Sequence, residues 1–219
     1  MSSSLILFDI DGTLVDVRGA GRRAFVRALE LTWGVVDELH DVQFRGGTDL
    51  GVLHQLRARL PLADAHDRAF FRAMEQTLLQ ELRAQKPRVF AGVHATLQHF
   101  VDDDAVLGFV TGNAMRCAFV KVEEAGIDRR PFDVGGFGDE HPDRRVLARL
   151  AKERAEQVRG GPFERVLLIG DTPNDVDAAR HIGATAVGVT TGSYDRQSLI
   201  ACGADVVVDS LSELIPRAT

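Results

Sequence analysis

The sequence predicts an α/β protein: a doubly wound parallel sheet core with an inserted α-helical domain. Two observations indicate this class. Short, continuously apolar runs alternate with longer segments of helical periodicity, which is the order of elements in a Rossmann-like sheet built from βαβ units. Residues 16–87 break this order and show helical patterns alone.

The apolar runs are the expected strands. Five of them span residues 5–8, 106–110, 166–169, 186–189 and 206–208, and residues 132–137 are a weaker sixth candidate. The five runs are apolar throughout and do not alternate with polar residues. They therefore fit strands that are covered by helices on both faces, as in parallel sheets.

The expected helices of the core span residues 93–102, 114–125, 143–158 and 174–182. In the first of these, Val93, Leu97 and Val101 recur at every fourth position, so we expect them on one face. Asp143 stands at the start of the third and is its expected N-cap.

The insertion carries two apolar stripes at helical spacing. One contains Phe70, Met74, Leu78 and Leu82, and the other contains Leu50, Leu53 and Leu56. We therefore expect two domains: a Rossmann-like core formed by residues 1–15 and 88–219, and a helical domain formed by residues 16–87.

Composition limits the classes of partner. Among 219 residues, 26 Lys and Arg face 32 Asp and Glu, which gives a formal charge of −6 and argues against a nucleic-acid binder held by phosphate contacts. The apolar run at residues 5–8 is too short for a signal peptide, and no apolar run is long enough to span a membrane. Cys117 and Cys202 form no disulfide or metal pattern, so we expect a cytoplasmic protein.

Polar side chains follow three of the predicted strands at the point where each strand ends. They are Asp9, Asp11 and Gly12 after the first, Thr111, Gly112 and Asn113 after the second, and Asp171 and Asp175 after the third. Ligands of open α/β sheets bind beyond the carboxyl ends of the strands, so these groups are expected to converge.

The electrostatics of such a cluster restrict its chemistry. Two like charges about 4 Å apart repel by about 4 kcal/mol at an effective dielectric constant of about 20. Clustered aspartates would therefore take up protons or recruit a hard divalent cation, Mg²⁺ by preference. Gly12 allows backbone N–H groups to approach an anion, and Thr111 can donate a hydrogen bond to it. Acids, a cation and anion donors together predict phosphoryl chemistry.

These motifs resemble those of the haloacid-dehalogenase superfamily of hydrolases, and most closely its phosphoglycolate-phosphatase-like members. The matching stretches are residues 9–14 (DIDGTL), 111–113 (TGN) and 170–175 (GDTPND), with further similarity at residues 92–93 and 121–144. The helical insertion looks like the cap domain that this superfamily places after its first motif.

The resemblance implies a role for each matching residue. Asp9 would be the nucleophile that forms an aspartyl-phosphate, and Asp11 would be the general acid and base. Asp9, Asp11 through its carbonyl group, and Asp171 would hold Mg²⁺, with Asp175 close by. The phosphoryl group would be bound by Gly12, Thr111, Gly112 and Asn113. A second acid at Asp11 favours a phosphatase over a dehalogenase, because an alkoxide needs protonation and a halide does not.

The sequence departs from the family pattern at the third motif, where a Lys is usual. Arg144 is the best substitute, as a catalytic and phosphate-binding cation, and Arg145 is the second candidate. Residues 44–49 resemble a specificity loop, which would make Arg45, Gly46 and Thr48 substrate-contacting residues. The alternative is that this stretch only starts a helix, with Thr48 or Asp49 as its cap.

The function predicted from the sequence is a Mg²⁺-dependent phosphatase that acts on a small phosphorylated metabolite, phosphoglycolate-like or a sugar phosphate. A phosphomutase of the same superfamily is the nearest alternative, and a receiver-like phospho-acceptor module is the alternative from another class. The expected partner is a small-molecule phosphoester, with no nucleic acid and no membrane, in a monomer or small homo-oligomer.

Overall fold

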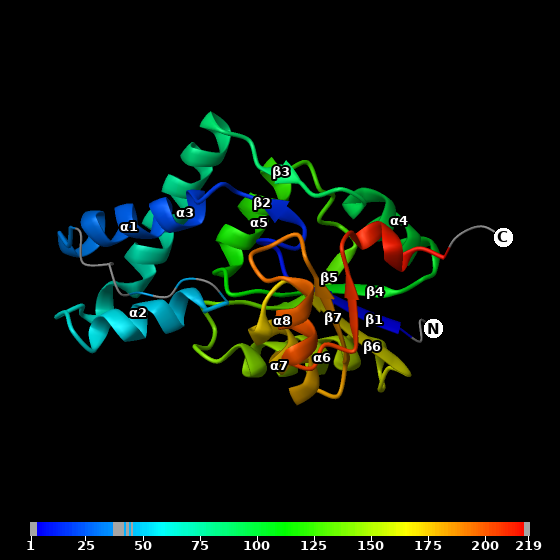
Figure 1. Ribbon diagram of the computed structural model, residues 1–219. Coiled ribbons are helices and arrows are strands. Elements are labelled where there is room, and N and C mark those ends of the chain that lie inside the picture. Colours follow the sequence, from blue (N-terminus) through cyan, green and yellow to red (C-terminus); the bar gives the residue numbers. More distant parts are fainter. Residues whose placement is uncertain (1–3, 37–41, 43, 45, 217–219) are drawn as a thin grey trace.

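The computed structural model describes residues 4–36, 42, 44 and 46–216. Its centre is a six-stranded sheet with the order β5-β4-β1-β6-β7-β8, in which all neighbouring strands are parallel (Figure 1). The strands are β1 (Ser4–Phe8), β4 (Val106–Val110), β5 (Phe132–Gly136), β6 (Arg165–Gly170), β7 (Thr185–Val189) and β8 (Val206–Val208). The six predicted strands are confirmed, including the weaker candidate, which forms β5.

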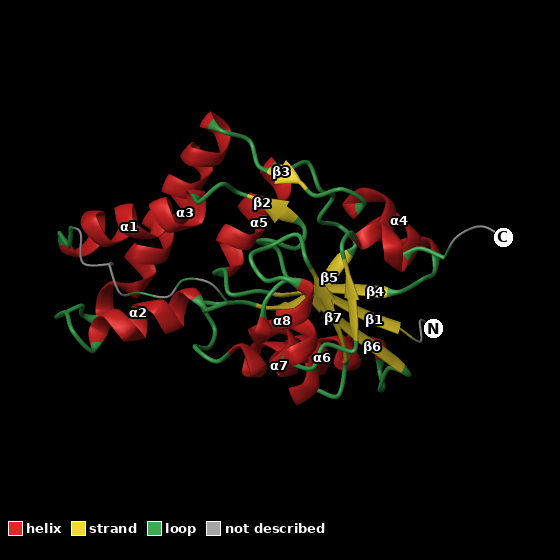
Figure 2. Ribbon diagram, viewed as in Figure 1, coloured by secondary structure: helices red, strands yellow, loops and turns green. Residues whose placement is uncertain are grey.

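Strand β1 lies inside the sheet and divides its side chains between two apolar layers. Ile6 and Phe8 join the layer under α4 (Val93–Asp102), whereas Leu5 and Leu7 join the layer formed with α6 (Arg144–Arg159) and α7 (Pro173–His181). All four side chains are fully buried. Figure 2 shows α4 on one side of the sheet and α6, α7 and α8 (Arg196–Ala201) on the other. Coverage of both faces explains why the strand sequences are apolar throughout.

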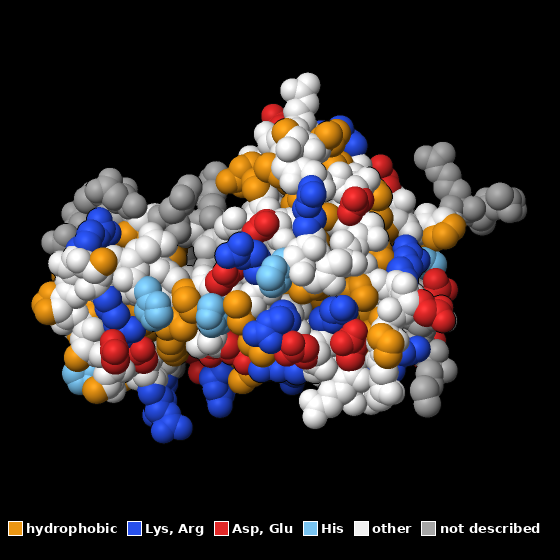
Figure 3. Space-filling model, turned by 90° about the horizontal axis from the view of Figure 1, so that it is seen from below, with side chains coloured by type: hydrophobic (Ala, Val, Ile, Leu, Met, Phe, Trp, Pro, Cys, Tyr) orange, Lys and Arg blue, Asp and Glu red, His pale blue; other side chains and the backbone are white. Residues whose placement is uncertain are grey.

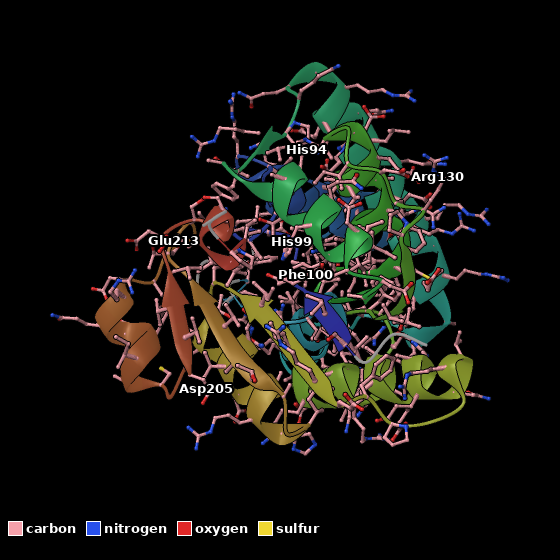
Figure 4. The ribbon with its side chains drawn as sticks, turned by 90° about the vertical axis from the view of Figure 1, so that its right-hand side faces the viewer. His94, His99, Phe100, Arg130, Asp205 and Glu213 are labelled. Carbon is pink, nitrogen blue, oxygen red and sulfur yellow. The ribbon has the colours of Figure 1, made fainter. Side chains whose placement is uncertain are left out.

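Helix α4 has the predicted bounds but a different buried face. The ring of Phe100 packs edge-on against that of Phe8, with centroids 6.2 Å apart. Phe100 is labelled in Figure 4 together with His94 and His99 of the same helix. Val93, Leu97 and Phe100 are buried, while Val101 is 39% exposed, so the expectation that Val101 shares their face is wrong. At roughly 3.6 residues per turn, position i+7 returns closer to the starting face than position i+8.

The insertion folds into helices, as predicted. It contains α1 (Ala20–Trp33), α2 (Asp49–Arg57), the short 3-10 helix η1 (Asp64–His66) and α3 (Asp67–Ala84). Strands β2 (Val15–Asp16) and β3 (Arg88–Val89) pair antiparallel at its two ends, which brings the entry and exit of the segment together. The predicted division at residues 16–87 stays a prediction, although this pair lies at both of its boundaries.

The helices of the insertion bury an apolar cluster of their own. The rings of Phe25 and Phe70 lie 4.9 Å apart within it. The stripe predicted in α3 is buried, and so are Leu53 and Leu56 of α2, while Leu50 is only half-buried. Helix α5 (Met115–Glu124) follows β4 but packs against α3, and its Cys117 enters this same cluster. The insertion is therefore anchored to the helix that follows the second motif.

Acidic and basic side chains are interspersed on the face seen from below (Figure 3). Among the described residues, no helix has both the length and the apolar character needed to cross a membrane.

Candidate active site

The three predicted motifs meet at one edge of the sheet. Asp9 follows β1, Thr111 follows β4 and Asp171 follows β6, and these three strands are adjacent. The pairing of Phe8 with both Phe109 and Ile169 aligns the three strand ends. Parallel strands direct their carboxyl ends to the same edge, so convergence of the motifs follows from the topology.

Three carboxylates form a compact, buried cluster. The cluster consists of Asp9, Asp171 and Asp175, which are 4%, 5% and 2% exposed. One carboxylate oxygen from each residue lies within 4.8 Å of one oxygen from each of the other two. Asp175 belongs to the first turn of α7, where its Oδ2 accepts hydrogen bonds from Thr172 N at 3.0 Å and from Thr172 Oγ1 at 2.6 Å. This capping box fixes the side chain against the other two carboxylates.

Among the residues that the structure describes, one guanidinium enters the cluster. Arg144 is 6% exposed, and its Nη2 lies 2.6 Å from Asp9 Oδ1 and 2.7 Å from Asp175 Oδ1. The same nitrogen donates a hydrogen bond to the carbonyl of Val110 at 3.0 Å. Arg145 is exposed and pairs with Asp143, which caps α6 as predicted. Of the two candidate arginines, the structure brings Arg144 to the carboxylates and leaves Arg145 at the surface.

The carboxylates are short of positive charge. Burial raises the pKa of Asp9 to about 6, although Arg144 opposes the rise, and burial with repulsion from Asp9 raises the pKa of Asp171 to about 8. When all three acids are ionised, three negative charges face one positively charged guanidinium, so two negative charges are uncompensated. The described residues give Asp171 only one weak hydrogen bond, from Thr13 Oγ1 at 3.4 Å.

A divalent cation fits this donor set. The ligand atoms are carboxylate oxygens. Such oxygens bind hard cations such as Mg²⁺ in preference to softer transition metals. Its two positive charges would match the deficit of two, and Asp171 would gain the partner it lacks. Asp9, Asp171 and Asp175 therefore form a candidate site for a divalent cation. The contribution of the Asp11 carbonyl to this site stays a prediction.

The remaining phosphate-binding candidates lie beside the carboxylates. Asn113 Nδ2 donates to Asp11 Oδ2 at 2.7 Å and to Thr111 Oγ1 at 2.8 Å. Gly112 follows Thr111 and accepts a hydrogen bond through its carbonyl from the backbone of Asp49 at 2.7 Å. The structure thus brings the residues of the second motif together with the second acid of the first motif.

Gly12 is required by its backbone and by the space around it. Its φ is +82°, a conformation that favours glycine, and a Cβ atom there would lie 2.5 Å from Asp171 Oδ2. Only a residue without a side chain lets the first motif pass this close to the carboxylate of the last.

Sequence reasoning missed a buried lysine. Lys121 of α5 is 3% exposed, and its Nζ lies 2.5 Å from both Asp11 Oδ2 and Asn113 Oδ1. The family pattern places the expected cation in the third motif, which begins further along the chain. The available signal was helical spacing, because Lys121 falls on the same face as the buried residues Cys117 and Ala118. A charged residue on an apolar helix face indicates a buried partner.

Sequence reasoning also missed the loop after β7. Thr191 Oγ1 donates to the carbonyl of Gly12 at 2.5 Å, and a Cβ atom on Gly192 would overlap the carboxylate of Asp171. This strand end carries no charged residue, so its composition gave no sign of a site. The loop nevertheless forms a wall of the carboxylate cluster.

The insertion is hydrogen-bonded, through the start of α2, to the sheet edge where the three motifs meet. Asn174 Nδ2 donates to the carbonyl of Gly46 at 2.7 Å, and Ala114 N donates to Asp49 Oδ2 at 2.7 Å. Burial raises the pKa of Asp49 to about 7. Thr48 caps α2, accepting from Gly51 N, and its hydroxyl donates to the carbonyl of Pro142 at 3.0 Å. Of the two predicted caps, Thr48 is the N-cap of α2.

Gly46 and Thr48, two of the predicted specificity residues, differ in their access to the cavity. Gly46 lines the cavity beside the carboxylates, as does Asp49, whereas Thr48 is 2% exposed and its hydroxyl is engaged by backbone groups. Arg45 lies outside the described residues. A contact of Thr48 or Arg45 with substrate stays a prediction.

The cavity has the size of a small-molecule site. It measures about 560 Å³ and is lined by Asp9, Asp11 and Asp171 from the core. From the insertion and its connections come Arg18, Arg22, Phe44, Met74 and Arg88, and from the loop after β7 come Thr191, Gly192, Ser193 and Tyr194. The sheet edge where the three motifs meet and the insertion therefore line one cavity.

Comparison with known proteins shows the family. The model for haloacid dehalogenase-like hydrolases matches residues 4–183, so the chain belongs to this family. A probable phosphatase, IndB, from Dickeya dadantii is 28% identical over 223 residues and covers 98% of this chain and 93% of the relative. A phosphoglycolate phosphatase from Synechococcus elongatus is 28% identical over 216 residues, covering 98% and 96%.

Solved structures show the same fold. CbbY from Rhodobacter sphaeroides, crystallised in complex with phosphate, is 20% identical and has a TM-score of 0.75, with 98% of this chain and 96% of that chain covered. A hydrolase from Pseudomonas syringae is 23% identical with a TM-score of 0.72, covering 98% and 96%. These structures confirm the predicted α/β class. The family model and the curated relatives confirm the predicted hydrolase activity and the resemblance to phosphoglycolate-phosphatase-like members of the family.

The close approach of the β7 loop to Asp171 predicts a metal-binding defect. In the Gly192→Ala variant the added methyl group must displace the Asp171 carboxylate, so stabilisation by the metal should fall. We expect the rise in melting temperature produced by 5 mM MgCl₂, on the order of a few degrees for the wild type, to be largely lost.

Gly161→Ala is the matched control, because a Cβ atom there meets only the end of one flexible side chain, at 3.9 Å. It should keep the full magnesium shift. An unchanged shift in Gly192→Ala would show that this loop does not constrain Asp171.

Proposed function

We propose that the protein is a Mg²⁺-dependent phosphatase that hydrolyses a small phosphorylated metabolite through an aspartyl-phosphate on Asp9. The observation that carries this proposal is the position of Asp9: it is buried between a guanidinium and two further carboxylates, with the second acid of its motif beside the cavity. A carboxylate held in this way suits attack on phosphorus once its charge is balanced.

The first half-reaction transfers the phosphoryl group to Asp9. A carboxylate oxygen of Asp9 forms a bond to phosphorus while the ester P–O bond breaks, and Asp11 gives its proton to the departing alkoxide oxygen. Arg144 keeps Asp9 oriented and balances part of the negative charge, while Thr111 and Asn113 offer donors to the phosphoryl oxygens. Mg²⁺ bound by the carboxylates would neutralise further charge on the phosphoryl group.

The second half-reaction restores the enzyme. Asp11, now a carboxylate, takes a proton from a water molecule whose oxygen attacks phosphorus, and the bond between phosphorus and Asp9 breaks. Inorganic phosphate leaves and Asp9 is again a free carboxylate. One residue thus acts first as acid and then as base, which is why the second acid of the motif is needed.

The alternatives are weaker. A receiver-like module does not fit a family model that spans residues 4–183 or a helical insertion between the first strand and the rest of the sheet. A phosphomutase uses the same first half-reaction and differs in the acceptor. Analysis of products separates the two, because only the phosphatase releases inorganic phosphate with each turnover.

The cavity favours a small anionic substrate. Arg18 and Arg22 are exposed residues of the cavity wall, and the guanidinium of Arg22 lies 5.5 Å from the ring centroid of Phe44. Both line the cavity that the carboxylates also line, so the part of the substrate beyond the phosphoryl group would meet them there. A carboxylate or hydroxyl-bearing leaving group, as in phosphoglycolate or a sugar phosphate, suits these donors. Several relatives are named phosphoglycolate phosphatase, which supports the same class.

We also infer a cytoplasmic protein that acts as a monomer or small homo-oligomer. Cys117 is free and buried and Cys202 is free and exposed, which suits a reducing compartment.

Replacement of the nucleophile tests the proposal. Wild-type protein with MgCl₂ should release phosphate from at least one member of a panel of phosphoglycolate, glycerol phosphate and sugar phosphates. Asp9→Asn should lower turnover by a factor of about 10⁴ or more, because an amide cannot form the intermediate.

Asp16→Asn is the control, since Asp16 lines the same cavity but is not one of the clustered carboxylates. It should retain activity within about threefold of wild type. Absence of phosphate release from every substrate, or full activity in Asp9→Asn, would contradict the proposed function.

The arginines of the cavity wall predict a preference for charge. Arg22→Gln should raise KM for phosphoglycolate about tenfold, the value of one charge-assisted hydrogen bond, and should change KM for ethyl phosphate by less than about twofold. Steady-state kinetics on the two substrates measures this. Arg68→Gln, an exposed arginine of α3 away from the cavity, is the control. Equal effects on both substrates would show that Arg22 does not contact the anionic group.

A further inference from the structure

Lys121 is a buried cation that the reaction scheme above leaves without a role. It lies on the inward face of α5 next to Cys117, Ala118 and Val122, all fully buried. Burial lowers the pKa of Lys121, but attraction from Asp11 and Asp49 outweighs this and raises the pKa above its usual value. Lys121 is therefore charged, and a buried charge with specific partners indicates a task beyond packing.

The contacts of Lys121 form a closed triangle. Its Nζ lies 2.5 Å from Asp11 Oδ2 and 2.5 Å from Asn113 Oδ1, and Asn113 Nδ2 donates to the same Asp11 oxygen at 2.7 Å. Because Lys121 can only donate, it determines which end of the Asn113 amide faces it. The amide nitrogen is thereby turned toward Asp11 and toward Thr111 Oγ1 at 2.8 Å.

The two buried cations of the site serve different acids. Arg144 pairs with Asp9 and Asp175 and makes no ion pair with Asp11. Lys121 contacts Asp11, and its contacts do not include Asp9. The nucleophile and the second acid are thus held independently, from α6 and from α5 respectively.

We propose that Lys121 is a positioning residue for the acid–base step, which orients Asp11 against Asn113 and stabilises the carboxylate that Asp11 becomes when it protonates the leaving alkoxide. This inference rests on the proposed phosphatase function. The proton moves from Asp11 to the alkoxide oxygen as the ester P–O bond breaks, and the negative charge left on Asp11 lies against the Lys121 ammonium. The charge is relieved when Asp11 takes a proton from water in the second half-reaction.

The dependence of the rate on the leaving group tests the inference. The parameter kcat/KM reports steps through formation of the aspartyl-phosphate, so it isolates departure of the leaving group from later hydrolysis. Departure of an alkoxide needs the acid, whereas departure of 4-nitrophenolate does not. Loss of Lys121 should therefore slow an alkyl phosphate far more than 4-nitrophenyl phosphate.

The variants are Lys121→Met, which removes the charge and the donors, and Lys121→Gln, which keeps a donor and a similar length. With Lys121→Met, kcat/KM for the alkyl phosphate should fall by about ten- to a hundredfold, which is part of the factor of about 10²–10⁴ that acid–base catalysis supplies. The value of kcat/KM for 4-nitrophenyl phosphate should fall by less than about threefold. Lys121→Gln should lie between Lys121→Met and wild type. Lys152→Met, whose lysine is partly exposed and paired with Glu156 on α6, should change neither value.

The outcomes separate the two proposals. An equal loss on both substrates, or no loss, in a variant that melts cooperatively overturns the role of Lys121 while the phosphatase function stands. If Lys121→Met does not fold, the Lys121→Gln comparison decides in the same way. The alkyl phosphate is the best substrate of the panel used to test the proposed function. Wild-type protein that hydrolyses neither it nor 4-nitrophenyl phosphate overturns the proposed function itself, and the role of Lys121 with it.

Discussion

Crowding of ionised side chains at one edge of the sheet is the constraint on which the rest of the structure depends. Asp9, Asp171 and Asp175 are nearly inaccessible to water, and Arg144 alone of the described cations enters their cluster. Isolated carboxylates this deeply buried would be protonated or would unfold the edge. The guanidinium, the capping of α7 and the close approach of Gly192 hold the three acids together. When all three are ionised, two negative charges are in excess.

The fold was largely readable from the sequence because its signals are local. Continuous apolar runs predicted five of the six strands, a weaker signal predicted β5, and helical spacing predicted α3 and its buried stripe. The motifs at the strand ends converge because parallel neighbours must share an edge. What could not be read depends on tertiary contacts. Val101 turned outward because the helix face follows i+7, and the β7 loop reached Asp171 through backbone and glycine, which leave no chemical signature in the sequence.

The cations show the same division between local and tertiary information. Arg144 stood directly after the cap of a predicted helix in the expected motif, and the structure places it in the cluster. Lys121 belongs to no motif, and its partner Asp11 is 110 residues away. Helix α5 links the two halves of the molecule, since one part of its face packs into the insertion through Cys117 and another reaches Asp11 through Lys121. One helix therefore contacts both the insertion and the second acid of the first motif.

The central claim, that a divalent cation relieves this excess of negative charge, is tested most directly by calorimetric titration with Mg²⁺ in buffers of different ionisation enthalpy. In the free protein Asp171, with a pKa of about 8, is mostly protonated at pH 7, and Asp9, at about 6, is mostly ionised. The account predicts one bound Mg²⁺ and release of roughly one proton at pH 7, falling toward zero by about pH 9.5. No Mg²⁺ binding, or binding at pH 7 without proton release, would contradict it.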